Sequence, residues 1–152
     1  MIFVEKIVPV PRDRLVTIRD DSLLADAARF LDGRHINLVV VCDCDKGGAM
    51  TGIVTRTDVV RQISLFLGKG CGCTVPVAAA MTRDVIYCRP DDILQDVWST
   101  MKERKLLHVP IVGKDFRPLG VINARDALLL LLEASEHEGA LLREYVMGIG
   151  YH

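Results

Sequence analysis

The sequence has no long hydrophobic run, few aromatic residues and almost no net charge. Its longest fully apolar run, Ala127 to Leu132, has six residues, whereas a membrane-spanning helix needs about 20. Aromatic residues make up only 5%, which argues against a base-stacking surface for single-stranded nucleic acid. The 19 basic and 20 acidic residues nearly cancel, so nothing draws the chain generally to nucleic acid or anionic membranes. We expect neither as a partner.

The N-terminus and the cysteines bear on the compartment. Residues 1–6 have no basic start, no long apolar stretch and no small-residue cleavage site, so we expect no secretory signal and a cytoplasmic location. The chain has five cysteines, an odd number that favours reduced thiols. They are Cys42, Cys44, Cys71, Cys73 and Cys88. The two Cys-x-Cys pairs could supply zinc ligands, but their spacing is tighter than the usual Cys-x₂₋₄-Cys, and we predict no metal site.

Several common catalytic motifs are also missing. The four histidines are scattered, without a His-x₃-His pair, and no Gly-x-Ser-x-Gly turn is present. No Gly-x-Gly-x-x-Gly opens a helix, and Gly47-Gly48 lacks the Lys-Ser/Thr ending of a phosphate-binding loop. No set of acid, base and nucleophile converges in sequence. We therefore predict a protein that is not an enzyme and that requires no cofactor.

Half of the residues are hydrophobic, and their pattern shows an internal repeat. Residues 21–31 carry an apolar stripe at positions 23, 24, 27, 28 and 31. Residues 91–101 carry the same stripe at 93, 94, 97, 98 and 101, a constant offset of 70. The spacing predicts two amphipathic helices, and a shared register over such a length indicates a duplicated unit.

The register continues beyond these helices. The β-rich run 38–42 matches 108–112, and Gly52 to Asp58 matches Gly120 to Asp126 at an offset of 68. Each half therefore reads strand, helix, strand, strand, helix. Pro110 interrupts one run, so that strand should lie at an edge or carry an irregularity. Because so small a half buries little surface alone, we expect an α+β fold with the halves packed about a pseudo-twofold axis.

The repeat divides the chain into four segments. We assign 1–70 to the first repeat with an N-terminal segment, 71–80 to a linker, 81–132 to the second repeat and 133–152 to a helical extension. Gly68 to Cys73 has the composition of a flexible joint. Helical spacing at Leu141, Leu142, Tyr145 and Val146 indicates that the extension docks on the body or on a partner chain.

The duplicated motifs resemble those of a tandem pair of cystathionine β-synthase (CBS) domains. The resemblance extends from Val8 to Leu132 and is carried by Gly52 to Asp58, Ala80 to Ile86 and Leu107 to Val112. It implies two β-α-β-β-α repeats and a regulatory module that binds AMP, ADP, ATP, S-adenosylmethionine or an NAD-type molecule in clefts between the repeats. It also implies a homodimer that acts on an unknown regulated protein through a change of shape.

The motif Thr55-x-x-Asp58 has two interpretations. Ser/Thr-x-x-Asp/Glu before a helix is a capping box, and Asn123 could cap the matching helix equally well. Alternatively, the ionised carboxylate accepts two hydrogen bonds from the vicinal hydroxyls of a ribose. A single copy favours the capping box by roughly two to one, and the duplication alone does not decide between them.

The resemblance assigns ligand-binding residues to two mixed clefts. The first combines Thr55, Arg56, Thr57, Asp58, Thr82, Val85, Leu107 and His108. The second combines Val16, Ile36, Asn37, Asn123, Arg125 and Asp126. Cations near the motifs, Arg56, Arg83, Lys105, His108 and Arg125, could receive phosphates or could simply be solvated. Asn123 replaces the Ser/Thr of the family pattern, so the first cleft is the stronger prediction.

Two other functions stay open at this point. The chain could be a non-catalytic scaffold or dimerisation protein with vestigial clefts, which Asn123 favours slightly. It could also be a redox- or metal-responsive protein that uses Cys71 and Cys73, since a glycine-rich loop would expose them.

Overall fold

Two similar units pack side by side in the computed structural model, which describes residues 2–7, 14–33, 36–45, 47–66 and 75–135. The first unit contains β1 (Thr17–Arg19), α2 (Leu24–Leu31), β2 (Leu38–Cys42), β3 (Met50–Thr55) and α3 (Arg56–Phe66). The second contains α5 (Leu94–Arg104), β4 (His108–Val112), η3 (Lys114–Phe116), β5 (Pro118–Asn123) and a helix over 124–135. Two short helices, η1 (Val4–Ile7) and α4 (Val77–Ala80), precede the units. The α+β fold with a duplicated unit is confirmed.

The duplication extends to the irregularities of the sheets. In the first sheet, ordered β1-β2-β3, β2 runs parallel to β1 and antiparallel to β3. The second sheet pairs β4 with β5, and the first strand expected there is reduced to one parallel bridge between Cys88 and Ile111. The register shifts between Val41 and Cys42 in β2 and at the matching place, directly after Ile111, in β4. As expected, Pro110 lies next to this irregularity in a two-stranded sheet.

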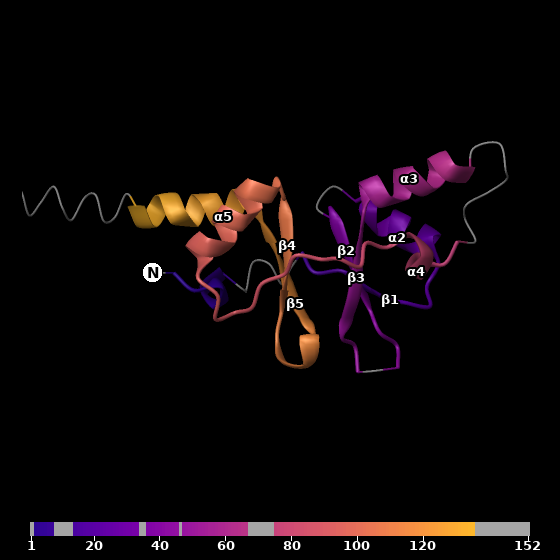
Figure 1. Ribbon diagram of the computed structural model, residues 1–152, viewed down its shortest axis with the longest axis horizontal. Helices are drawn as coiled ribbons and strands as arrows, with labels where there is room; N and C mark the ends of the chain where they lie inside the picture. Colours follow the sequence, from indigo (N-terminus) through magenta and orange to yellow (C-terminus); the bar gives the residue numbers. More distant parts are fainter. Residues whose placement is uncertain (1, 8–13, 34–35, 46, 67–74, 136–152) are drawn as a thin grey trace, which may run out of the picture.

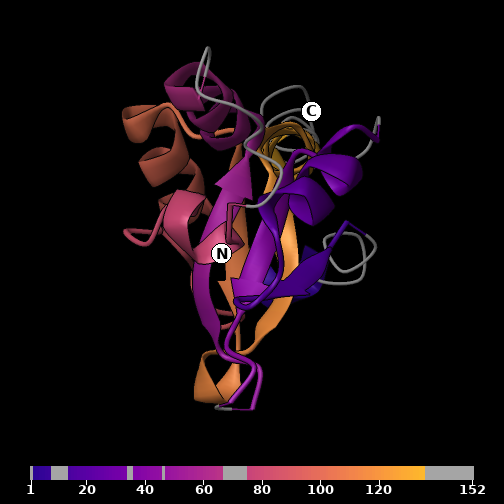
Figure 2. The same cartoon turned by 90° about the vertical axis from the view of Figure 1, so that its right-hand side faces the viewer.

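The two sheets face each other, and helices cover their outer sides (Figure 1). Along β2, Val39 and Val41 pack in the core of the first unit, whereas Leu38 and Val40 pack against the second sheet. A strand that is buried on both faces reads as a continuous apolar run, which explains the sequence of β2. In Figure 2, viewed from the first unit, the second sheet lies behind the first and both hairpin tips point the same way.

The short helix that precedes each unit in the sequence packs into the core of the other unit. Val4 of η1 is fully buried in the core of the second unit, and its amide donates to Asp92 O at 2.9 Å. Val77 of α4 is fully buried in the core of the first unit, where Leu24 N donates to Val75 O at 2.8 Å. The predicted linker 71–80 therefore ends in a helix that belongs to the first core, and this exchange ties the units together.

The chain between α4 and the second unit runs against β3. Ile53 and Thr82 exchange backbone hydrogen bonds of 3.0 and 2.8 Å. A Cβ atom at Gly52 would lie 2.7 Å from the carbonyl oxygen of Thr82, so this close approach requires glycine. It places the Thr82 side chain beside the start of α3.

Some predicted features lie outside the described residues. These are the joint at 68–73 with Cys71 and Cys73, and the extension beyond residue 135 with its apolar positions 141–146. Within the described ranges, no helix is long and apolar enough to cross a membrane.

Candidate functional site

A cavity of about 400 Å³ opens where the two units meet. We call it the seam cavity. The first unit contributes Asn37, Leu38, Ile53, Thr55, Arg56 and Thr57, and the second contributes Lys105, Leu106, Leu107 and His108. Its volume is in the range of small-molecule sites, which combine apolar walls with a few placed polar groups. Four lining residues are aliphatic, three are basic, and no carboxylate is among them.

Chain turns at two helix ends bring these residues together. On one side β3 ends at Thr55 and α3 begins directly at Arg56, so the N-terminus of α3 borders the cavity. On the other side α5 ends at Arg104, and the next residue, Lys105, has a left-handed φ of 57° and ψ of 43°. This turn leads Leu107 to the rim with 69% of its surface exposed. An exposed aliphatic residue at a cavity rim offers a contact surface for a flat apolar group.

Asp58 is not among the residues that line the cavity, and its carboxylate accepts hydrogen bonds at the start of α3. One carboxylate oxygen, Oδ2, accepts hydrogen bonds from Thr55 N at 2.9 Å and Thr55 Oγ1 at 3.2 Å. The other, Oδ1, accepts from Thr82 Oγ1 at 3.0 Å and Arg61 Nη1 at 3.2 Å. Asp58 is only 3% exposed. One of the two hydrogen bonds of a capping box is therefore present, the one from Thr55 N to the Asp58 carboxylate, and the binding of a ribose by this carboxylate stays a prediction.

Arg56 fastens the loop between α2 and β2. Its guanidinium donates to the carbonyl oxygens of Leu31 at 3.0 Å, Gly33 at 3.1 Å and Ile36 at 3.3 Å. It also donates to Asn37 Oδ1 at 2.6 Å. The fork geometry of a guanidinium suits several acceptors at once. Arg56 therefore borders the cavity as a charge and holds the wall residue Asn37 in place.

His108 stands among cationic groups at the start of β4. Burial, and then the positive charges of Arg14 and Arg56, hold the pKa of His108 below its ordinary value of 6.5. Its Nε2 lies 3.5 Å from Asn123 Nδ2. The ring is therefore mostly neutral at pH 7, and a negative charge nearby would favour its protonation.

The residues predicted for the second cleft are engaged with other protein groups. Asp126, the counterpart of Asp58, forms an ion pair with Arg14 and is 29% exposed. Asn123 Oδ1 accepts a hydrogen bond of 2.8 Å from Arg125 N, so it caps its helix, and the Arg125 side chain is exposed. Val16 packs against the core of the first unit.

The structure thus gathers about half of the predicted site residues in one cavity. From the first predicted cleft these are Thr55, Arg56, Thr57, Leu107 and His108, and Asn37 joins them from the second. Asp58 and Thr82 are hydrogen-bonded to each other and do not line the cavity, and Val85 packs between the sheets. Sequence reasoning missed Leu38, Ile53 and Leu106. The alternation along β3 could have indicated Ile53, whereas Leu106 lies between α5 and β4, where no periodicity marks it.

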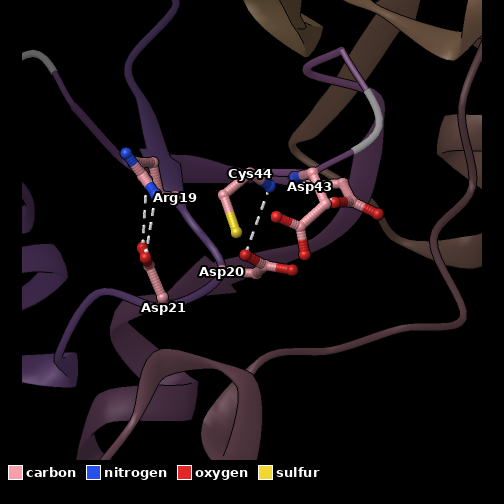
Figure 3. Close-up of polar contacts among 6 residues, drawn as sticks. Arg19, Asp20, Asp21, Asp43 and Cys44 are labelled. Carbon is pink, nitrogen blue, oxygen red and sulfur yellow. Dashed lines mark hydrogen bonds and ion pairs between the residues drawn. The ribbon is translucent and has the colours of Figure 1, made fainter.

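Ligand-type side chains also gather at the end of β1 and the hairpin after β2 (Figure 3). Single atoms of Asp20, Asp21 and Cys44 lie within 4.8 Å of one another, close to Asp43. Arg19 donates to Asp21 at 2.9 Å, and Cys44 N donates to Asp20 at 3.3 Å. Protein donors thus already serve the carboxylates of Asp20 and Asp21, and the group is largely exposed.

The thiols of the described cysteines are not activated. Burial raises the pKa of Cys88 to about 12, with a further contribution from Asp92. Burial also raises the pKa of Cys42, and a hydrogen bond to Asp20 raises that of Cys44. Because the thiolate is the reactive form, none of these three cysteines has the lowered pKa of a redox or nucleophilic site.

Comparison with known proteins identifies the fold and the family. The CBS domain profile matches residues 4–65 and 77–133. A homoserine O-acetyltransferase of Methanohalobium evestigatum is 24% identical over 119 residues, which are 78% of this chain but only 22% of that protein.

Two solved structures have the same fold. A crystal structure of CBSX2 in complex with AMP has a TM-score of 0.72 and 20% identity, covering 89% of this chain and 99% of that one. The CBS domain pair of protein MJ0100, in complex with 5'-methylthioadenosine and S-adenosylmethionine, has a TM-score of 0.66 and 21% identity, covering 89% and 98%. With both units matched by the profile, the chain is a tandem repeat protein of the CBS domain family.

Proposed function

We propose that the chain is a non-catalytic regulatory module that binds an adenosine-containing ligand in the seam cavity. The observation that carries the proposal is the composition of this cavity, in which aliphatic side chains from both units stand opposite hydroxyl and cationic groups. The AMP and S-adenosylmethionine complexes of two proteins with this fold support the ligand class.

Occupancy of the seam cavity would act on the angle between the units. Its walls come from both halves, so a ligand that contacts both favours one relative arrangement over others. Such a ligand shifts the population of arrangements by its differential affinity for them. We propose that a regulated protein binds one of these arrangements in preference to the others.

Thermal unfolding with adenosine, AMP, ADP, ATP, S-adenosylmethionine and NADH tests the proposal. A ligand at 100 times its dissociation constant stabilises the fold by about 2.7 kcal/mol, which raises the melting temperature by roughly 5–10 °C at this chain length. Leu107→Ala should reduce this shift, and the control Leu23→Ala, at an exposed leucine away from the cavity, should keep it. A wild-type protein that responds to none of these compounds would favour the scaffold interpretation.

We further propose that the chain forms a homodimer through α3 and the helix over 124–135. Val60 and Ile63 on α3, and Leu129 and Leu132 on its counterpart, are exposed with a spacing of three residues. Both views place these helices at the end opposite the hairpin tips (Figures 1 and 2). Pseudo-symmetric helices suit an isologous contact, in which the same patch on both copies is self-complementary.

Light scattering after size exclusion tests the dimer. The wild-type chain should have twice the mass of one chain, and the double variant Val60→Lys, Leu129→Lys should have the mass of a single chain. Both residues are exposed, so the variant should unfold at a similar temperature. A wild-type protein that stays monomeric at high concentration would exclude this interface.

A further inference from the structure

The charges around the seam cavity are of one sign. Arg56, Lys105 and His108 line it, and no carboxylate is among its lining residues. The acidic side chains of the two helix starts are engaged with protein groups, because Asp58 accepts hydrogen bonds from Thr55 and Thr82 and Asp126 pairs with Arg14. A cavity lined in this way attracts an anion and repels a cation.

Two backbone features strengthen this preference. The N-terminus of α3, an 11-residue helix, carries the positive end of the helix dipole and borders the cavity at Arg56 and Thr57. At the facing end of α5, Lys105 occupies a left-handed conformation that glycine usually takes. Strained residues of this kind are concentrated at functional sites, and Lys105 is among the residues that line the cavity.

His108 is the titratable group in this wall. The charged groups around it are Arg14, Arg56 and Lys105, with Asp126 bound to Arg14. In the ligand-free protein these cations oppose a further positive charge on the ring. A dianion in the cavity would offset them, so protonation of His108 would then be favourable.

We propose that the seam cavity selects a phosphorylated, anionic ligand over a neutral or cationic adenosine compound, and that His108 takes up a proton from solvent when this ligand binds. The inference rests on the proposed function and deepens it, because it names which members of the adenosine class bind and how pH regulates them.

Titration calorimetry with four compounds tests the selectivity. AMP should bind about tenfold or more tightly than adenosine, since charge-assisted hydrogen bonds are the strong ones. S-adenosylmethionine, which carries a sulfonium and an ammonium group, should bind no better than adenosine. Ribose 5-phosphate should bind measurably, because it presents the anion without the base.

The outcomes separate the two proposals. Equal affinities for AMP, adenosine and S-adenosylmethionine would overturn the inference and leave the proposed function standing. Binding of ribose 5-phosphate with the same affinity as AMP would support the anion site and overturn the requirement for adenosine. If no compound binds, both proposals fail.

Calorimetry of AMP binding in buffers of different ionisation enthalpy measures the proton uptake. At pH 7 the wild-type protein should take up a fraction of a proton, up to about one, and His108→Gln should take up much less. The AMP phosphate itself titrates near pH 6, so at pH 7 it is mostly dianionic and can release only a small fraction of a proton on binding. The difference between them therefore reports His108, and unchanged uptake in His108→Gln would overturn its assignment.

Lys105 offers a variant pair in which stability and binding change in opposite directions. Lys105→Gly removes both the backbone strain and the charge, so its melting temperature should rise by a few degrees while AMP affinity falls several-fold. Lys105→Gln removes only the charge, so it should lose the same affinity without the rise in stability. Affinity for AMP that is unchanged in both variants would overturn the role of Lys105 in anion selection.

Discussion

Asp58→Ala should lower the melting temperature of the ligand-free protein by about 10 °C. The substitution leaves the part-buried donors Thr55 N, Thr55 Oγ1 and Thr82 Oγ1 without their acceptor. A lost N-terminal cap costs about 0.5–2 kcal/mol, and part-buried donors that lose their acceptor add about 1 kcal/mol or more. A total of about 3 kcal/mol corresponds to this shift at a length near 150 residues. Calorimetric melting of the purified variant measures it.

The matched control is Asp126→Ala, at the same register position of the second unit. Its carboxylate is 29% exposed and pairs with Arg14, so screening by solvent limits the loss to about 1 kcal/mol or less. An Asp58→Ala protein that melts like wild type but loses its response to adenosine ligands would show that Asp58 binds ligand and does not stabilise the helix. The pair therefore decides between the two interpretations of the Thr55-x-x-Asp58 motif.

The duplicated register predicted the order of the helices and strands because each of them has its own periodic pattern of buried residues, which is visible in the sequence. β2 illustrates this, since its run of five apolar residues follows directly from burial on both faces. The exchange of η1 and α4 between the units was not predictable in this way. Val4 and Val77 are apolar residues in short segments without periodicity, and only tertiary packing decides which core receives them.

The sequence predicted which residues line the candidate site better than it predicted the directions of their side chains. Thr55, Thr57 and His108 do line one cavity, but the directions of Asp58 and Arg56 depend on which acceptors and donors lie nearby in three dimensions. For Arg56 these acceptors are carbonyl groups in a loop about 20 residues earlier in the chain. Every residue has a backbone carbonyl group, so the sequence cannot show which of these groups accept hydrogen bonds from Arg56.

The two clefts expected from the duplication are unequal because the units differ at corresponding positions. The first unit has Arg56 where the second has Ala124, and Thr55 where the second has Asn123. Arg14 reaches Asp126, whereas Asp58 turns to the donors of Thr55 and Thr82. The open, cation-lined seam cavity thus arises from one unit's helix start and the other unit's strand start, and we expect one strong ligand site per chain.

Arg56→Lys should lower both the stability of the chain and its affinity for every ligand of the seam cavity. A single ammonium group spans only part of the set formed by Leu31 O, Gly33 O, Ile36 O and Asn37 Oδ1. Three of these four hydrogen bonds are exposed to solvent, which weakens them, so the partial loss should cost about 1 kcal/mol. Because the freed loop carries Asn37 away from the wall, affinity should fall by about tenfold.

The ligand series separates positioning from direct contact at Arg56. If the guanidinium acts by fastening the loop, AMP and adenosine lose affinity by the same factor in Arg56→Lys, because both need the same wall. If it binds phosphate itself, only AMP weakens, and adenosine binds as before. Arg125→Lys, an exposed arginine at the matching helix start, controls for the general effect of the exchange. Since each of the three guanidinium nitrogens of Arg56 donates to the segment between Leu31 and Asn37, we expect the parallel loss.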